Sequence, residues 1–337
     1  MYSATRREFN AYLHQQAEFN SGENAGQQPA VLPSAEQRLE NKVCASSNFL
    51  QSINIHGVSK QKGEKLGRHI ELTLSEIGDK NTEGQLHADR TIMAKDWYHC
   101  QQTKFATHIE YATLNLWAKS PDFQVRLCRA ATWQIAHDRM MIGFNPERGT
   151  AVSDLTADPL QQEMNIGWLQ HLRQQRAEAV VSNIRVGQGG DYASIDEAVL
   201  DAASELITRW YQDDPDLLVI IGHELLPDQQ FTLPEQQQRV AADKFNNLDI
   251  SFSNLQIGGL NAIRVPFFPT RSFIITCLDN LSIYYQQGSH RRKIIDNPKR
   301  RRIEDLQSIN QAYVIEDYDL ICLVENILIP DGSGGWQ

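Results

Sequence analysis

The sequence predicts a mixed α+β protein with a globular body and projecting segments. Residues 68–75 and 103–111 alternate apolar and polar side chains, which predicts two strands joined by a long polar tip. Residues 121–142 repeat apolar side chains at helical spacing, and residues 195–285 alternate predicted helices and strands around one sheet. The chain has 337 residues, enough for about two domains and a sizeable core.

Composition excludes several classes of protein. Apolar residues make up 41% of the chain, which excludes wholesale disorder, and the net charge of −10 argues against nonspecific coating of nucleic acid. Five scattered cysteines without a CxxC pair argue against a disulfide framework or a zinc site. The chain has no run of about 18 apolar residues and no signal-peptide pattern, so we expect no membrane partner and synthesis in a cytoplasm.

The N-terminal part predicts a helix, a linker and an arm. Residues 5–19 are amphipathic, and residues 21–34 are rich in Gly, Gln and Pro. That linker fits either a frayed terminus or a removable pro-segment. Residues 35–43 predict a second helix, and residues 49–55 predict an extended segment that is not part of a compact unit.

The predicted hairpin cannot be stable alone. Its tip, residues 76–94, holds few large apolar groups, and an isolated two-stranded hairpin is marginally stable in water. Its apolar face must be covered by the rest of the chain, by a substrate under a lid, or by another copy of the protein. The apolar residues of this face are Ile70, Leu72, Leu74, Phe105 and Ile109.

The long predicted helix has clear start and stop signals. Ser120, Pro121 and Asp122 form a helix start, and Gly143 occupies a position typical of a C-cap. The opposite side of this helix carries arginines, which fit either a solvated face or contact with carboxylates of a neighbour: Arg126, Arg129 and Arg139.

No pattern argues for an enzyme. The glycine-rich loop at residues 187–190 precedes a helix, as phosphate-binding loops do, but its spacing matches neither GxGxxG nor a Walker A motif. Ser194 and Glu197 form a capping box that explains the helix start without a ligand. His223 and Glu224 lack the second histidine of HExxH. Without a nucleophile, metal or cofactor motif, we expect no cofactor and no catalysis.

Several blocks along the chain are specific enough to compare with known families. The short ones include Phe9-Asn10-Ala11-Tyr12-Leu13, Ser46-Ser47-Asn48-Phe49-Leu50 and Gly167-Trp168-Leu169-Gln170. The most specific blocks are residues 184–198, 210–222, 281–292 and 313–318. Together the blocks run nearly from end to end, and they resemble the major capsid proteins of P2-like tailed bacteriophages.

The resemblance implies the HK97-type capsid fold, an α+β fold with named parts. The implied division is a leader at 1–33, an N-arm at 34–57, an extended hairpin or E-loop at 58–111, a peripheral domain at 112–194 with its spine helix at 121–142, an axial domain at 195–288, peripheral return strands at 289–330 and a flexible tail at 331–337. Residues 313–329 would form the long strand of the peripheral domain.

The resemblance also implies a function and partners. Members form pentamers and hexamers of an icosahedral shell that encloses double-stranded DNA in the virion, after assembly in the bacterial host cytoplasm. Their implied partners are other copies of the chain, a portal protein and an internal scaffold that is also a protease. That protease trims the N-terminus, and the corresponding bond would lie near Gln28, Pro29 and Ala30.

Contacts between copies are expected at the hairpin, the long helix and two basic runs, residues 290–293 and 299–302. We expect these runs to meet acidic patches on neighbours rather than packaged DNA, because no aromatic side chains interleave with the basic residues. The expected contact residues are Ile70, Leu72, Leu74, Phe105, Ile109, Arg126, Arg129, Arg291, Arg292, Arg300 and Arg301.

Two alternatives to a phage shell protein also fit parts of the sequence. A shell protein of a cargo-holding compartment would share the fold, but the leader-like segment at residues 1–33 argues against it. A cytosolic phosphate-using α/β enzyme would use the loop at residues 187–190 and would bind nucleotide.

Overall fold

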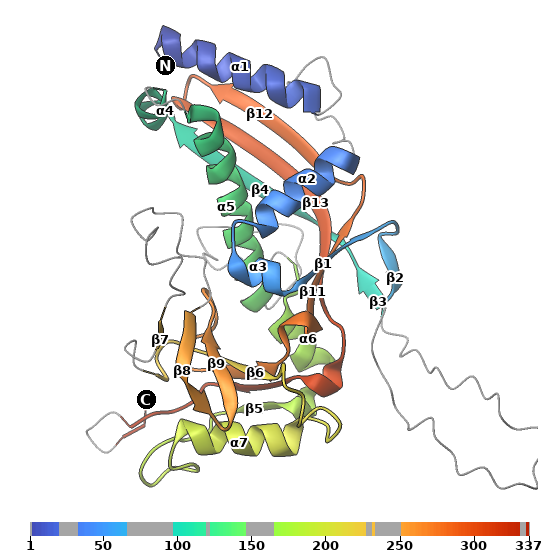
Figure 1. The fold of residues 1–337 in the computed structure, drawn as a ribbon, viewed down its shortest axis with the longest axis vertical. Helices are drawn as coiled ribbons and strands as arrows, with labels where there is room; N and C mark the ends of the chain where they lie inside the picture. The colour runs from blue at the N-terminus through green and yellow to red at the C-terminus, as the bar shows by residue number, and fades with distance from the viewer. Residues whose placement is uncertain are drawn as a thin grey trace, which may run out of the picture.

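The structure is a computed structural model that describes residues 2–19, 33–65, 97–118, 122–145, 165–226, 231–232, 251–330 and 335–336. Figure 1 shows an elongated molecule with one sheet in its upper half and a second sheet in its lower half. The helices are α1 (Ser3–Phe19), α2 (Pro33–Cys44), α3 (Asn48–Ser52), α4 (Tyr111–Trp117), α5 (Phe123–Phe144), α6 (Trp168–Gln175) and α7 (Ile195–Leu206). Short 3₁₀ turns are η1 (Ala177–Ala179), η3 (Leu278–Asn280) and η4 (Tyr318–Leu320).

The upper sheet is organised around one long strand. Its members are β1 (Asn54–Val58), β4 (Gln101–Glu110), β11 (Leu281–Gln286), β12 (Arg291–Asn297) and β13 (Arg302–Ile315). The first half of β13 lies between β12 and β4, and its second half pairs with β11. Because β11 and β12 follow each other along one side of β13, the three strands form one long hairpin with its turn at residues 298–301.

The structure corrects the partner of the predicted strand at residues 103–111. This segment forms β4, and its odd-numbered side chains face inward as the alternation predicted. However, β4 pairs with β13 over its whole length and is therefore part of the body. The chain on either side of the predicted tip instead pairs as β2 (Lys62–Glu64) with β3 (Trp97–His99), and we call this pair the hairpin stem. The other predicted strand, residues 68–75, and the tip at 76–94 lie outside the described residues.

The lower sheet has seven strands. Its spatial order is β5 (Val180–Ser182), β14 (Cys322–Glu325), β10 (Phe273–Thr276), β6 (Leu218–Ile221), β9 (Leu260–Arg264), β8 (Ser251–Ile257) and β7 (Phe231–Thr232). Helix α7 packs against this sheet from below (Figure 1). Its start has the predicted capping box, because the Glu197 amide donates to Ser194 Oγ and the Ala193 amide donates to Glu197 Oε2.

The strands of the lower sheet do not coincide with the axial domain expected at residues 195–288. Strand β11 belongs to the upper sheet, whereas β5 and β14, from outside that range, belong to the lower one. The expected strand at residues 313–329 is also interrupted, because β13 ends at Ile315 and the chain crosses to the lower sheet as β14. The crossing is held by Asn280, whose side chain bonds both the backbone amide (2.7 Å) and the carbonyl (2.8 Å) of Asp317.

An aromatic cluster joins the two halves of the molecule. Trp168, fully buried at the start of α6, has its ring centroid 5.3 Å from that of Phe144 and 5.1 Å from that of Tyr313. Gly143 lies inside α5 rather than at a C-cap, and a Cβ there would lie 2.2 Å from the Trp168 ring. The glycine is therefore needed for close packing of helix against indole, not for a turn.

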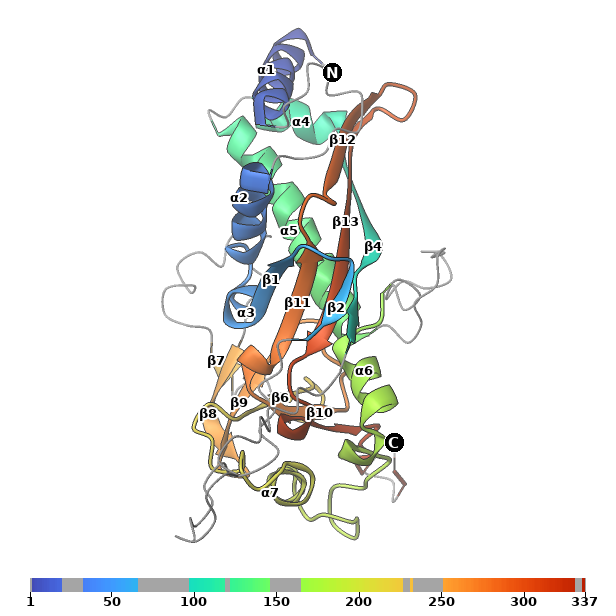
Figure 2. The same cartoon turned by 90° about the vertical axis from the view of Figure 1, so that its right-hand side faces the viewer.

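Helix α5 is the predicted long helix, and it packs against α2 and β4. Seen at right angles in Figure 2, α5 follows the length of the upper sheet. No helix in the described part of the chain is both long and apolar enough to cross a membrane.

Candidate functional site

The arm helix α2 is anchored by a buried ion pair that the sequence did not reveal. Arg139 on α5 donates from Nη1 to Glu40 Oε2 (2.6 Å) and from Nη2 to Glu40 Oε1 (3.0 Å), and the two side chains are 1% and 6% exposed. Arg139 Nε also donates to Gln311 of β13 (3.2 Å). Burial opposes the charge on Arg139, but the Glu40 carboxylate beside it raises the net pKa of the guanidinium above its usual value. Arg139 was expected either on a solvated helix face or against carboxylates of a neighbour, and the structure instead pairs it with a carboxylate of its own chain.

A second carboxylate completes the attachment of α2. Glu36 is 1% exposed and accepts a hydrogen bond from the Gly288 amide, in the turn between β11 and β12, at 2.9 Å. The segment expected to be extended at residues 49–55 begins instead with helix α3, whose Phe49 and Leu50 are buried in the main core. The arm predicted as a projection is therefore packed on its own body from Pro33 to Val58.

A small hydrophobic cluster lies at the end of the molecule that carries the N-terminus. This tip cluster is separate from the main core and consists of Phe9, Tyr12, Leu114, Phe123, Leu127 and Ile303. Helix α1 supplies Phe9 and Tyr12, and α4, α5 and β13 supply the rest. The amphipathic helix predicted at residues 5–19 is thus confirmed, and its apolar face covers the tip.

Polar contacts around the tip cluster also involve α1. Arg292 is 7% exposed and pairs with Asp305 at 2.6 Å, and its Nη2 donates to the Tyr12 hydroxyl at 3.0 Å. Burial raises the pKa of Tyr12, although the charge of Arg292 opposes the shift. At the other end of α1, Thr5 Oγ1 donates to Asn115 Oδ1 at 2.9 Å.

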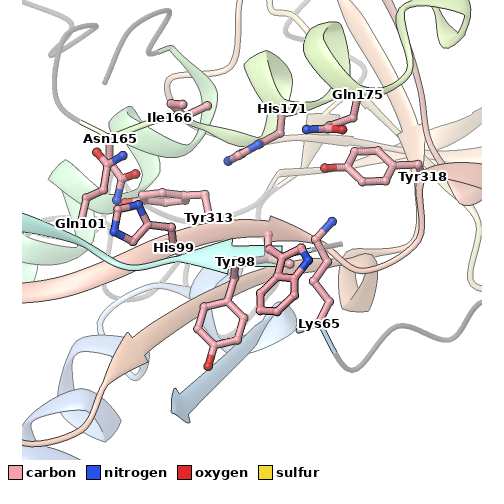
Figure 3. A pocket seen from close by; sticks show the side chains of 13 residues that line it. Lys65, Tyr98, His99, Gln101, Asn165, Ile166, His171, Gln175, Tyr313 and Tyr318 are labelled. Carbon is pink, nitrogen blue, oxygen red and sulfur yellow. The ribbon is translucent and has the colours of Figure 1, made fainter. Parts of the chain in front are cut away.

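The root of the projecting hairpin borders a cavity of about 220 Å³. Figure 3 shows Tyr98 and Lys65 on one side, His171 and Gln175 of α6 on another, and Tyr313 and Tyr318 between them. Lys65 Nζ donates to the Ile315 carbonyl at 3.2 Å and lies 4.3 Å from the centroid of the Tyr318 ring. Among the described residues that line the cavity none carries a carboxylate. Through the contacts of Lys65 with Ile315 and Tyr318, this lining ties the end of the described arm segment to the body.

Acidification is expected to destabilise the chain through His171. Burial, with a smaller effect from the charge of Lys65, lowers the pKa of His171 from 6.5 to about 4. Between these values the unfolded chain binds a proton that the folded chain does not, so the free energy of unfolding falls as pH falls from 6.5 to 4 and levels off below that. The loss through this group is up to about 3 kcal/mol.

The measurement for this expectation is urea unfolding of the wild-type chain and of His171→Gln at pH 7, 5.5 and 4. His171→Gln is the matched control, because glutamine keeps a polar side chain but does not titrate. The variant should lose less stability between pH 7 and pH 4 than the wild type. Equal losses in the two chains would contradict the role given to His171.

The glycine-rich loop at residues 187–190 is occupied by the chain's own C-terminal segment. A Cβ at Gly187 would lie 2.6 Å from Pro330, and a Cβ at Gly190 would lie 2.8 Å from the Trp336 ring. The Gly187 amide donates to the Tyr192 carbonyl, and the Gly190 amide donates to the Gly187 carbonyl. The lack of a side chain at Gly187 and Gly190 thus lets Pro330 and Trp336 pack against the loop. The two amides already donate hydrogen bonds to carbonyls of the loop.

The structure corrects two residues expected at contacts between copies. Phe105 is 3% exposed in the main core, and Arg292 is buried against Asp305, so both are used inside their own chain. Arg291 is half-buried and donates to the backbone carbonyls of Gly288 and His290. Ile109 is half-buried and packs against the tip cluster.

Four of the expected contact residues are exposed at the tip end of the molecule. Arg126 and Arg129 lie on the first turns of α5, and Arg300 and Arg301 lie in the turn between β12 and β13. The Tyr111 amide donates to the Arg301 carbonyl (2.9 Å), which places this turn beside the start of α4. We name these four residues the arginine edge. The other expected site residues, Ile70, Leu72, Leu74, Gln28, Pro29 and Ala30, lie outside the described residues.

The described residues contain no group of three or more His, Cys, Asp or Glu side chains that could hold a metal ion. The described part of the chain does contain the anchored arm, the tip cluster with the arginine edge beside it, and the hairpin stem.

Comparison with known proteins agrees with this arrangement. Residues 8–327 match the family model described as phage major capsid protein, P2 family. The capsid proteins of Escherichia phage P2 are 42% identical over 99% of this chain and 97% of the relative. The major capsid protein of Serratia phage KSP20 is 31% identical over 99% of this chain and 100% of the relative.

A solved structure supports the fold. The satellite phage P4 procapsid, which includes size determination (Sid) protein, contains a chain with a TM-score of 0.76 and 41% identity to this one. The match covers 88% of this chain and 99% of that chain. The expected HK97-type α+β capsid fold is confirmed, and the chain is a structural component of a virion rather than an enzyme. The phosphate-using enzyme and the cargo shell are set aside, and the chain belongs to the P2 family of phage major capsid proteins.

Proposed function

We propose that the chain forms pentamers and hexamers that build the icosahedral head shell around double-stranded DNA. Assembly takes place in the bacterial host cytoplasm, with an internal scaffold that is also a protease and with a portal protein at one vertex. The observation that carries the proposal is the similarity to P2 capsid proteins over 99% of the chain. An isolated domain shared with other proteins would not give a match of that extent.

Weak contacts repeated many times are sufficient for such a shell. A contact of millimolar strength contributes about 4 kcal/mol, and a subunit within a closed shell makes several at once. Early assembly then stays reversible, because a single contact breaks readily, whereas the closed shell holds each subunit through all its contacts. The net charge of −10 repels DNA phosphates, which suits a shell that encloses DNA without binding it tightly.

The arginine edge and the hairpin are the proposed contact surfaces between copies. Arg126, Arg129, Arg300 and Arg301 place positive charge on the tip of an otherwise acidic chain. An acidic surface of the next copy is the complementary partner. The stem, β2 paired with β3, lies at the edge of the body (Figure 1), and the hairpin segment between these strands is the proposed contact with a neighbour.

Deletion of residues 78–94 is expected to stop shell completion while leaving the body folded. The body keeps its stem, β2–β3, and both sheets, whereas the tip that would reach the neighbour is lost. Electron microscopy should show capsomers or monomers in place of closed shells, with circular dichroism like that of the wild type. Normal closed shells from the deletion would overturn this role of the hairpin.

Mature particles are expected to lack about the first 30 residues, by analogy with the family. The proposed bond lies near Gln28, Pro29 and Ala30. Intact mass spectrometry of the shell protein from mature particles and from protease-free assemblies gives the comparison. The two masses should differ by the leader, and full-length chain in mature particles would rule out processing.

A further inference from the structure

Several large apolar side chains are exposed at the tip of a single chain. Among the described residues, six large apolar side chains are strongly exposed, and three of them lie at this end of the molecule. Tyr2 immediately before α1, Leu116 on α4 and Val125 on α5 are 70%, 68% and 66% exposed. Leu116 and Val125 lie on two of the elements that hold α1, so a second copy placed against this end would bury apolar surface there.

Helix α1 fills a site formed by α4, α5, β12 and β13, which we call the tip site. Phe9 and Tyr12 enter the tip cluster, which is separate from the main core. The polar contacts pair residues of α1 with residues of α4 and β12: Thr5 and the Tyr2 amide with Asn115, Arg6 with Asp296, and Tyr12 with Arg292. An identical helix from another copy makes the same set of contacts.

The chain length allows α1 to reach a neighbour. Helix α1 ends at Phe19 and α2 begins at Pro33, so thirteen residues connect them. Thirteen residues span at most about 45 Å when fully extended. Figures 1 and 2 place α1 at one end of the long axis of the molecule.

We propose that, in shells of the full-length chain, α1 is exchanged between copies, so that α1 of one chain fills the tip site of the next. The proposal rests on the proposed shell function. When the chain is dilute, the thirteen-residue connection holds α1 near its own tip site at an effective concentration on the order of 1 mM, so α1 stays bound to its own chain. In a shell, adjacent tip sites are also presented at a concentration on the order of 1 mM, so neither site is favoured by proximity. The contacts of α1 are the same in either site, so exchange loses none of them, and a neighbour whose α1 enters the site also covers exposed apolar side chains of α4 and α5.

Two single-cysteine chains test the exchange. One chain carries Thr5→Cys and the other Asn115→Cys, because these side chains meet across the α1–α4 contact at 2.9 Å. Both also carry Cys44→Ala and Cys128→Ala, which remove the two half-buried native thiols. After oxidation, the mixed disulfide can only join two chains, and it is read as a band of twice the chain mass on a non-reducing gel.

Co-assembled shells should give this band in about half of the chains, and the same mixture kept dispersed at about 10 µM should give roughly 100-fold less. Each single-cysteine chain assembled alone should give no band. Adding Phe9→Ser to the Thr5→Cys chain should reduce the band, since Phe9 holds α1 in the site.

A chain carrying both Thr5→Cys and Asn115→Cys is the reactivity control. If the mixture gives no interchain band while this chain closes an internal disulfide in shells, α1 stays on its own body and the exchange is overturned. If neither disulfide forms in shells, α1 does not occupy the tip site there, which also overturns it. Failure of all chains to form shells by electron microscopy contradicts the proposed function itself, and is thereby distinguished from failure of the exchange alone.

Discussion

Arg139→Ala is expected to lower the free energy of unfolding by about 3–5 kcal/mol, because it leaves a buried carboxylate without its partner. Glu40 is 6% exposed and has both oxygens bonded to the guanidinium. Without Arg139, the carboxylate must either take up a proton or admit water between α2 and α5. Urea unfolding at pH 7, followed by circular dichroism, measures the loss.

The matched control is the double variant Arg139→Met with Glu40→Leu. It removes both charges and keeps apolar volume in the same place, so most of the stability should return. A single variant that costs less than about 1 kcal/mol would mean that the arm helix is not held by this pair. A double variant no more stable than Arg139→Ala would place the loss in packing rather than in the uncompensated charge.

Trp168→Ala is expected to cost a further large amount, about 3–5 kcal/mol, because the side chain is fully buried where four elements meet. Its ring contacts Phe49 of α3, Phe144 of α5 and Tyr313 of β13, and its Nε1 donates to the Ser282 carbonyl of β11 at 3.0 Å. Truncation leaves a cavity between the two halves of the molecule and removes that carbonyl's indole donor.

Trp168→Phe separates the two effects. Phenylalanine keeps an aromatic ring in the cluster but lacks the N–H donor, so it should lose less stability than alanine does. Thermal unfolding of the three chains gives the comparison. Equal midpoints for wild type and Trp168→Ala would show that the cluster does not join the upper and lower halves.

Local patterns in the sequence predicted several elements well. The apolar repeat after Pro121 predicted the long helix now seen as α5, and Ser194 with Glu197 predicted the start of α7. In both cases the signal lies within one helix, so the chain's own neighbours are sufficient to produce it.

Partners far apart in the chain were not predictable in the same way. The alternation in residues 103–111 gave the inward-facing side of β4 correctly, but nothing in it identified β13 as the partner strand. Arg139 and Arg292 have the spacing of surface residues, and only the folded chain brings Glu40 and Asp305 against them. Gly143 fitted the position of a helix end, but the reason for it is the indole of Trp168.

By itself, the sequence determined the α+β class, the positions of the main helices and strands, and the resemblance that led to the capsid family. The tertiary structure alone decided which strands share a sheet, which arginines are buried, and that α1 covers the tip cluster. The physical reason is range. Periodicity and capping depend on residues within a few positions of each other, whereas strand pairing and buried ion pairs depend on segments that meet only once the whole chain has closed around its core.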